Sequence, residues 1–135
     1  MAPNSVRLQA EEELLRNVLD AFNRHDLDAI MSFFSEDCRF DMPRGPHPFG
    51  LRYKGKHGVR EGLAGRFSGI PDVHYGDDRH FVSASGDRGV SEWLLSGTSV
   101  SGERVEVRGC DLFEFDGHGK IRVKDSYWKI VTQGK

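Results

Sequence analysis

The chain has 135 residues, enough for one domain with a sizeable apolar core. Its 19 basic and 21 acidic residues are interspersed and give a net charge of −2, without the basic stripe that nucleic-acid binding needs. The N-terminus has no basic region followed by an apolar run, and no stretch reaches the roughly 18 apolar residues of a membrane span. We therefore expect a single domain (1–135) that is soluble and cytoplasmic, with neither nucleic acid nor a membrane as partner.

The first part of the chain has the pattern of helices. Apolar residues at helical spacing predict a long first helix, namely Leu8, Leu15, Val18, Leu19 and Phe22. Asn23–His25 interrupts it, and Asp26 is a candidate N-cap for a short second helix, Leu27–Phe34. Cys38–Met42 predicts a short strand.

A segment rich in helix breakers follows. Pro43–Gly50 contains three prolines and two glycines and predicts a long loop that continues to Gly55. Val59, Leu63 and Phe67 then predict a third helix, which three glycines weaken by about 1 kcal/mol each relative to alanine.

After Pro71 the pattern becomes that of strands. The predicted strands are His80–Val82, Val90–Ser96, Val105–Phe115 and Ile121–Val131. Consecutive strands of this kind form an antiparallel meander whose apolar face must be covered, and the helices are the available cover. The predicted fold class is α+β, a cone in which a curved antiparallel sheet wraps over three N-terminal helices.

Asp111 is the most informative single residue of the predicted strand Val105–Phe115. Side chains two apart share a face of a strand, so Asp111 lies among Val107, Phe113 and Phe115. A buried carboxyl group either keeps its proton or finds a donor, and both outcomes suit chemistry. The alternative is an edge carboxylate that is solvated or paired with an arginine.

The cysteines and histidines predict no metal or cofactor. Cys38 and Cys110 are 72 positions apart and are expected to be reduced thiols. None of the six histidines has metal-ligand spacing, although His74 and His80 are close enough in sequence to meet in space. Neither GxGxxG nor GxxxxGK[ST] occurs, so no nucleotide cofactor is indicated.

The order of elements and several short segments resemble the SnoaL-like branch of the nuclear transport factor 2-like superfamily, over about Ala10 to Ile130. The segments are Phe22–Asp28, Phe34–Phe40, Gly55–Val59, Glu92–Thr98 and Arg108–Ile121. The resemblance implies a cone with an apolar pocket between sheet and helices, commonly as a homodimer packed through the sheet. The superfamily includes ketosteroid isomerases, limonene epoxide hydrolases, polyketide cyclases and noncatalytic modules, so the fold alone gives no reaction.

Only part of the isomerase set carries over. Asp111 matches the isomerase-type Asp that donates a hydrogen bond to an oxyanion, the role described for ketosteroid isomerase. The position of the general base falls on Met42, and Asp41 beside it faces the other way unless a bulge intervenes. The expected tyrosine of the first helix falls near Asn17 or Val18. A steroid isomerase in the strict sense is therefore disfavoured.

The epoxide hydrolase and cyclase patterns are also incomplete. The hydrolase Arg and second Asp fall on Gly109 and Ser126, and Arg108 and Asp125 each lie one residue away. Many SnoaL-like chains end the last strand with Tyr-Trp-Asp, whereas here the third residue is Lys129.

The sequence therefore leads to a hypothesis of a pocket enzyme without cofactor. It would be of isomerase, cyclase or lyase type and transfer a proton on a small apolar carbonyl or enol compound. Asp111 would stabilise the oxyanion and Asp41 or Asp125 would move the proton, with Lys129 or His74 as candidate partners. The competing interpretation places Asp125 and Lys129 in a surface ion network.

Aromatic side chains are the expected lining of the pocket. The candidates for ligand binding are Phe33, Phe40, Phe67, Trp93, Phe113 and Trp128. The alternatives left open are an epoxide hydrolase, which needs Asp125 and Arg108 turned inward, and a noncatalytic ligand-binding or dimerisation module.

Overall fold

A computed structural model describes residues 3–132, with side chains described from Val6 onward. Three helices are present in this part of the chain, α1 (Pro3–Asn23), α2 (Leu27–Met31) and α3 (Gly55–Gly69). The six strands are β1 (Phe34–Asp41), β2 (Arg52–Lys54), β3 (His74–Val82), β4 (Arg88–Thr98), β5 (Arg104–Phe115) and β6 (Ile121–Trp128).

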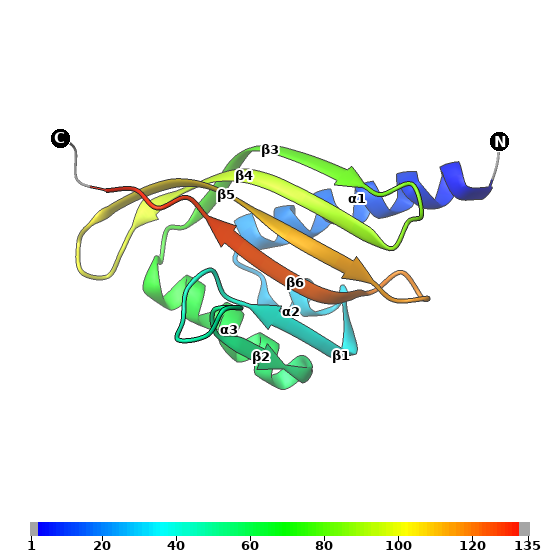
Figure 1. The fold of residues 1–135 in the computed structure, drawn as a ribbon. Coiled ribbons are helices and arrows are strands. Elements are labelled where there is room, and N and C mark those ends of the chain that lie inside the picture. Colours follow the sequence, from blue (N-terminus) through cyan, green and yellow to red (C-terminus); the bar gives the residue numbers. More distant parts are fainter. Residues whose placement is uncertain (1–2, 133–135) are drawn as a thin grey trace.

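The strands form one open, curved sheet, and the three helices lie against one of its faces (Figure 1). The strand order is β2-β1-β6-β5-β4-β3. The four strands from β3 to β6 form the predicted antiparallel meander, while β1 runs parallel to β6. The α+β cone is therefore confirmed, with a mixed rather than purely antiparallel sheet.

The core fills the space between the sheet and the helices. Alternate residues of β4 and β5 point into it, so Trp93, Leu95, Val107 and Phe113 are all buried. The apolar face of α1 meets them, because helix and strand periodicities each place one row of side chains inward. We call this side the inner face of the sheet and the opposite side the outer face.

Several predicted boundaries were wrong. β1 begins at Phe34 rather than Cys38, because Phe34 is buried and pairs with Ile121. The predicted loop contains the three-residue strand β2, too short to show a periodicity. β6 ends at Trp128 rather than Val131.

The predicted N-cap of the second helix is confirmed. Asp26 caps α2, because its carboxylate accepts a hydrogen bond from the backbone N–H of Ala29 at 3.1 Å. None of the helices within residues 3–132 is long and apolar enough to cross a membrane.

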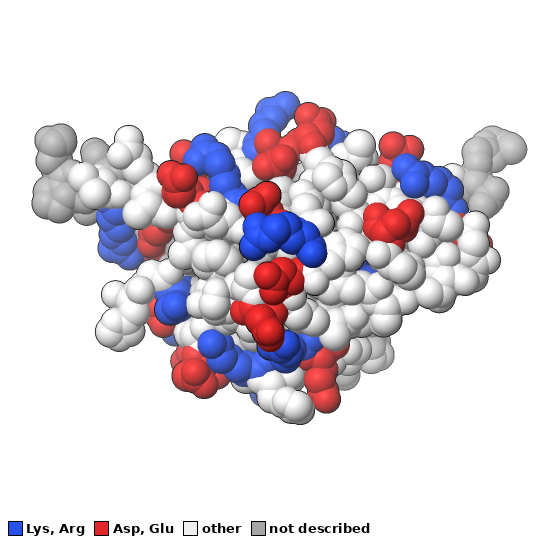
Figure 2. Space-filling view, turned by 180° about the vertical axis from the view of Figure 1, so that it is seen from behind, with Lys and Arg blue, Asp and Glu red and all other residues white. Residues whose placement is uncertain are grey.

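Charged residues of both signs are intermingled on the side of the molecule seen in Figure 2. Exposed ion pairs such as Arg24 with Asp20 occur on α1. The ion pair of Asp41 and Arg52 on the outer face is, by contrast, largely buried. Asp41 is 1% exposed and accepts two hydrogen bonds from Arg52, at 2.8 and 3.0 Å. This bidentate contact fastens β2 to β1.

We expect Asp41→Ala to lower the free energy of unfolding by about 2 to 3 kcal/mol. Breaking a buried ion pair costs about 3 to 5 kcal/mol, and the partly exposed Arg52 recovers some hydration. Chemical denaturation would measure the change. The matched control is Asp20→Ala, whose exposed pair is worth at most about 1 kcal/mol. Equal losses in both variants would contradict this assignment.

Candidate functional site

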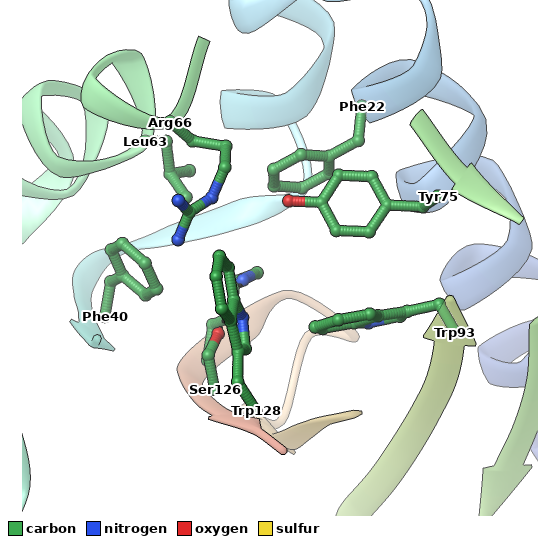
Figure 3. Close-up of a pocket in the computed structure, with 9 residues that line it drawn as sticks. Phe22, Phe40, Leu63, Arg66, Tyr75, Trp93, Ser126 and Trp128 are labelled. Carbon is green, nitrogen blue, oxygen red and sulfur yellow. Dashed lines mark hydrogen bonds between the residues drawn. The ribbon is translucent and has the colours of Figure 1, made fainter. Parts of the chain in front are cut away.

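A small cavity lies between the inner face of the sheet and helices α1 and α3 (Figure 3). Its free space is about 10 Å³, close to what one water molecule needs. Most of its wall is aromatic, and four side chains add polar groups. The lining residues are Phe22, Phe40, Leu63, Arg66, Tyr75, Trp93, Lys124, Ser126 and Trp128.

Asp111 lies directly behind this wall. It is 4% exposed and its carboxylate accepts hydrogen bonds from three side chains that line the cavity. The donors are Trp93 Nε1 to Oδ2 at 3.0 Å, and Lys124 Nζ and Ser126 Oγ to Oδ1 at 3.0 and 2.5 Å. Both carboxylate oxygens are thus used as acceptors, the pattern of an ionised group.

The strand register explains how these donors meet. Ser126 on β6 lies directly opposite Asp111 on β5, and Lys124 is two residues earlier on the same face of β6. Trp93 comes from β4 on the other side of β5. One buried carboxylate therefore joins three neighbouring strands through side chains.

Lys124 is buried and partly surrounded by aromatic rings. Its Nζ also donates to Ser126 Oγ at 2.9 Å, and it lies 4.6 Å from the ring centre of Phe40 and 5.3 Å from that of Phe22. Burial lowers the pKa of Lys124 below its ordinary value, and the charge of Arg66 acts in the same direction. The Asp111 carboxylate opposes the shift by stabilising the ammonium form.

Tyr75 and Arg66 supply further proton donors. Figure 3 shows the Tyr75 hydroxyl and the Arg66 guanidinium pointing toward each other across the cavity. Burial raises the pKa of Tyr75 to about 12, with the Asp111 charge adding to it and Arg66 opposing it. The ring of Tyr75 is fixed edge-on against Trp93, with centroids 5.1 Å apart.

Arg66 and Trp128 separate the cavity from solvent. They are the half-buried members of the lining set, whereas the others are buried. The guanidinium carbon of Arg66 lies 4.5 Å from the Trp128 ring centre, a cation–π contact between α3 and the end of β6. A ligand larger than water must displace this pair.

The charges favour a ligand with one anionic oxygen. Arg66 and Lys124 carry positive charge and Asp111 carries negative charge, which leaves an excess of one cation in an apolar wall. The Tyr75 hydroxyl adds a neutral donor. Donors fixed in a site of low dielectric stabilise an oxyanion more strongly than water does.

The structure does not bring Asp41 and Asp125 to this cavity. They are paired with each other in register on β1 and β6 and lie on the outer face. Asp41 is held by Arg52, and Asp125 accepts a hydrogen bond from Tyr127 at 3.3 Å. Burial and the nearby Asp41 charge raise the pKa of Asp125.

The remaining predicted partners also face away. Arg108 is exposed and paired with Asp77, and the β5–β6 register is regular from Gly109 to Glu114, so no bulge turns Arg108 or Asp125 inward. His74 and Lys129 are exposed. The arrangement that an epoxide hydrolase would need is therefore not formed.

The predicted aromatic set divides into two groups. Phe40, Trp93 and Trp128 line the cavity. Phe113 is a buried core residue, and Phe33 and Phe67 pack at the edge of the core. None of these last three lines the cavity.

Sequence reasoning missed the polar lining, namely Arg66, Tyr75, Lys124 and Ser126. The alternation that placed Asp111 inward would have placed Lys124, Ser126 and Trp128 on one face of β6, had it been applied there. Tyr75 and Arg66 gave no such signal, since their convergence depends on how α3 packs over the sheet.

A second cluster of polar side chains, His80, Ser91 and Asp78, lies next to Asp111 on the inner face. His80 contacts Ser91 Oγ through Nδ1 at 2.8 Å and Asp78 through Nε2 at 2.7 Å. Ser91 is paired in register with Asp111. None of these three side chains lines the cavity, and residues 3–132 contain no cluster of His, Cys, Asp and Glu suited to a metal ion.

Comparison with known proteins places this geometry in context. Residues 15–123 match the family model described as a SnoaL-like domain. No curated protein matches the chain in sequence.

Solved structures share the fold at low identity. A candidate polyketide cyclase from Xanthomonas campestris pv. campestris has 22% identity and a TM-score of 0.80, covering 91% of this chain and 93% of its own. The epoxide hydrolase/cyclase-like enzyme SalBIII of salinomycin pyran-ring formation has 20% identity and a TM-score of 0.77, with 90% and 92% covered. Rv0760c from Mycobacterium tuberculosis, in complex with estradiol-17beta-hemisuccinate, has 19% identity and a TM-score of 0.74, with 92% and 95% covered.

We expect Gly109→Ala to disturb the Trp93–Asp111 contact. A Cβ on Gly109 would lie 2.6 and 2.7 Å from the Trp93 ring and would also collide with the Tyr127 carbonyl oxygen. Overpacking of this kind costs about 1 to 3 kcal/mol, which thermal unfolding would measure. Gly58→Ala is the control, because the added methyl on α3 meets open space and should be neutral or stabilising. An unchanged Gly109→Ala would show that the ring has room to move.

We expect the stability of the protein to fall between pH 10 and 12 because of Tyr75. The unfolded chain loses this proton near pH 10, whereas the folded state keeps it to about pH 12, so rising pH favours unfolding across that window. The full loss is roughly 2 to 3 kcal/mol. Tyr75→Phe should show a shallower decline in chemical denaturation at several pH values. Parallel pH profiles for the two proteins would refute the assignment.

Proposed function

Because this chain belongs to the SnoaL-like domain family, we propose that it is an enzyme of isomerase, cyclase or lyase type that works without a cofactor. Its reaction would be proton transfer on a small apolar carbonyl or enol compound. The observation that carries the proposal is the buried Lys124–Asp111 ion pair. Lys124 lines a largely aromatic cavity that Tyr75 and Arg66 also line.

Lys124 would carry the proton. General acid–base catalysis is most efficient when the group titrates near the working pH, and burial lowers the pKa of Lys124 toward that range. As a neutral amine it takes a proton from carbon, and as an ammonium ion it returns one. Asp111 would be a positioning residue, because it touches Lys124, Ser126 and Trp93 rather than the cavity itself.

Tyr75 and Arg66 would stabilise the enolate oxygen. Removing a proton next to a carbonyl places negative charge on that oxygen, and both side chains reach the same small space. The hydroxyl of Tyr75 stays protonated at neutral pH because its pKa is about 12, so it donates a hydrogen bond throughout. This assigns the oxyanion contacts to residues other than Asp111, the residue that the sequence suggested for that role.

The ligand class fits the wall of the cavity. Planar apolar groups stack on Phe40, Trp93 and Trp128, while one oxygen meets the polar side. The steroid derivative bound by Rv0760c supports an apolar ligand for this fold. The Arg66–Trp128 contact would open to admit it.

The outer face would hold a second copy of the chain. Phe81 and Tyr127 are exposed there, 48% and 53%, and large exposed apolar groups favour association. The homodimer remains a prediction that these residues support, and it leaves the inner cavity of each copy free.

We expect the wild-type protein to exchange the α-protons of 4-phenylbutan-2-one with solvent deuterium, measured by NMR. Arg66→Met and Tyr75→Phe should each slow this exchange, since one oxyanion donor contributes about 100- to 1000-fold in rate. The physical reason is the loss of a fixed donor at the enolate oxygen.

Arg60→Met is the matched control for Arg66→Met. Arg60 is exposed on the same helix, where it pairs with Asp28, and its loss should leave the exchange rate unchanged. Absence of exchange above the buffer rate, across a set of small aryl ketones, would overturn the proposed reaction and favour a noncatalytic binding module.

A further inference from the structure

Lys124 is the one buried lysine among residues 3–132. Lys124 lines the cavity, and its Nζ lies close to the rings of Phe40 and Phe22 and donates hydrogen bonds to Asp111 and Ser126. Lysines in apolar surroundings or beside another cation are the ones that become nucleophilic amines. Arg66 supplies that second cation.

We propose that Lys124 forms a covalent imine with ligands that carry an aldehyde or ketone group. The inference rests on the proposed carbonyl ligand class but goes beyond it, because a general acid–base lysine needs no bond to the substrate. The geometry supports it, since Lys124 lines the same small space as Tyr75 and Arg66, so a carbonyl whose oxygen those two side chains hold would lie next to the lysine.

The reaction balances without any further reagent. Lys124 first gives one proton to the Asp111 carboxylate, to which it is already hydrogen bonded at 3.0 Å. The amine lone pair then forms the C–N bond as the carbonyl π bond breaks, and the nitrogen passes one proton to the oxygen to give a neutral carbinolamine. Asp111 returns its proton to that hydroxyl by way of Ser126, which is bonded to Asp111 and lines the cavity, and the hydroxyl leaves as water while the nitrogen lone pair forms the C=N bond. Overall, an ammonium ion and a carbonyl give a protonated imine and one water molecule.

The surroundings favour the imine over the free ammonium ion. The carbinolamine hydroxyl would lie beside the donors Tyr75 and Arg66, which assist its departure as water. The wall of Phe40, Trp93 and Trp128 limits the access of bulk water, which would hydrolyse the product.

The charges that act on Lys124 come from several elements. Asp111 on β5 favours the ammonium form, and Arg66 on α3 favours the amine. Tyr75 on β3 faces the same cavity as a neutral phenol, and Asp125 acts from the outer face in favour of the ammonium form. The pH at which adduct formation reaches half its maximum should therefore fall when the Asp111 charge is removed.

The test is incubation of the protein with 1-phenylbutane-1,3-dione, a diketone whose condensation with an amine gives a conjugated enaminone that absorbs in the near ultraviolet. Condensation releases water and leaves one proton with Asp111 or solvent. We expect one adduct per chain by intact mass, at Lys124 by peptide mapping.

Asp111→Asn should lower the pH at which adduct formation reaches half its maximum by at least one unit. At a fixed lower pH this corresponds to a roughly tenfold gain in reactive amine.

Two variants separate chemistry from folding. Lys124→Arg keeps the cation beside Asp111 but has no amine to condense, so it should lose the adduct while it retains the circular dichroism spectrum of the wild type. Lys129→Met removes an exposed lysine five residues away and should keep the adduct. Lys124→Met leaves the buried Asp111 without its ion pair and can therefore lower the stability of the fold. Its loss of the adduct counts only if Lys124→Arg loses the adduct as well.

The outcomes distinguish this inference from the proposed function. Absence of an adduct in the wild type, an adduct that persists in Lys124→Arg, or mapping to another lysine would overturn the imine. Deuterium exchange without any adduct would also overturn it while leaving the proposed reaction intact. An adduct at Lys124 without exchange would support the imine and overturn proton transfer as the reaction.

Discussion

The buried carboxylate of Asp111 is the constraint on which the site depends. An ionised group at this depth is tolerated only when donors surround it, and Trp93, Lys124 and Ser126 meet that need from the strands on either side. Those same three side chains form much of the polar and aromatic wall of the cavity. A stabilising requirement of the fold therefore also fixes the orientation of the groups to which we assign chemistry.

Part of this arrangement could be predicted from sequence, because alternation along a strand is a local property. The period of two placed Asp111 inward, but it left the facing of Asp41 and Asp125 open, because a bulge could have turned either residue toward the cavity. Tyr75 and Arg66 could not be assigned in this way. Their meeting depends on how α3 crosses the sheet, which results from packing over the whole core rather than from any short segment.

A row of polar side chains crosses the inner face and explains why this sheet tolerates so many buried polar groups. His80, Ser91, Asp111 and Ser126 occupy successive register positions on β3, β4, β5 and β6. Each has a hydrogen-bond partner, with Asp78 and Lys124 bonded to the two ends of the row. Satisfied polar groups cost little, so the row specifies the register of four strands without weakening the core.

The two faces of β6 separate the expected carboxylates from the cavity. Asp125 faces outward with Asp41, while Lys124 and Ser126 face the cavity, so the carboxylates expected for an isomerase or hydrolase are separated from Asp111 by the sheet itself. The group bonded to Asp111 on the cavity side is instead an amine, that of Lys124. An amine can act as a base and also as a nucleophile toward carbonyl carbon, which is why both of our proposals assign chemistry to Lys124. On the outer face, Asp41 holds the edge strand through Arg52, and Asp125 accepts a hydrogen bond from Tyr127.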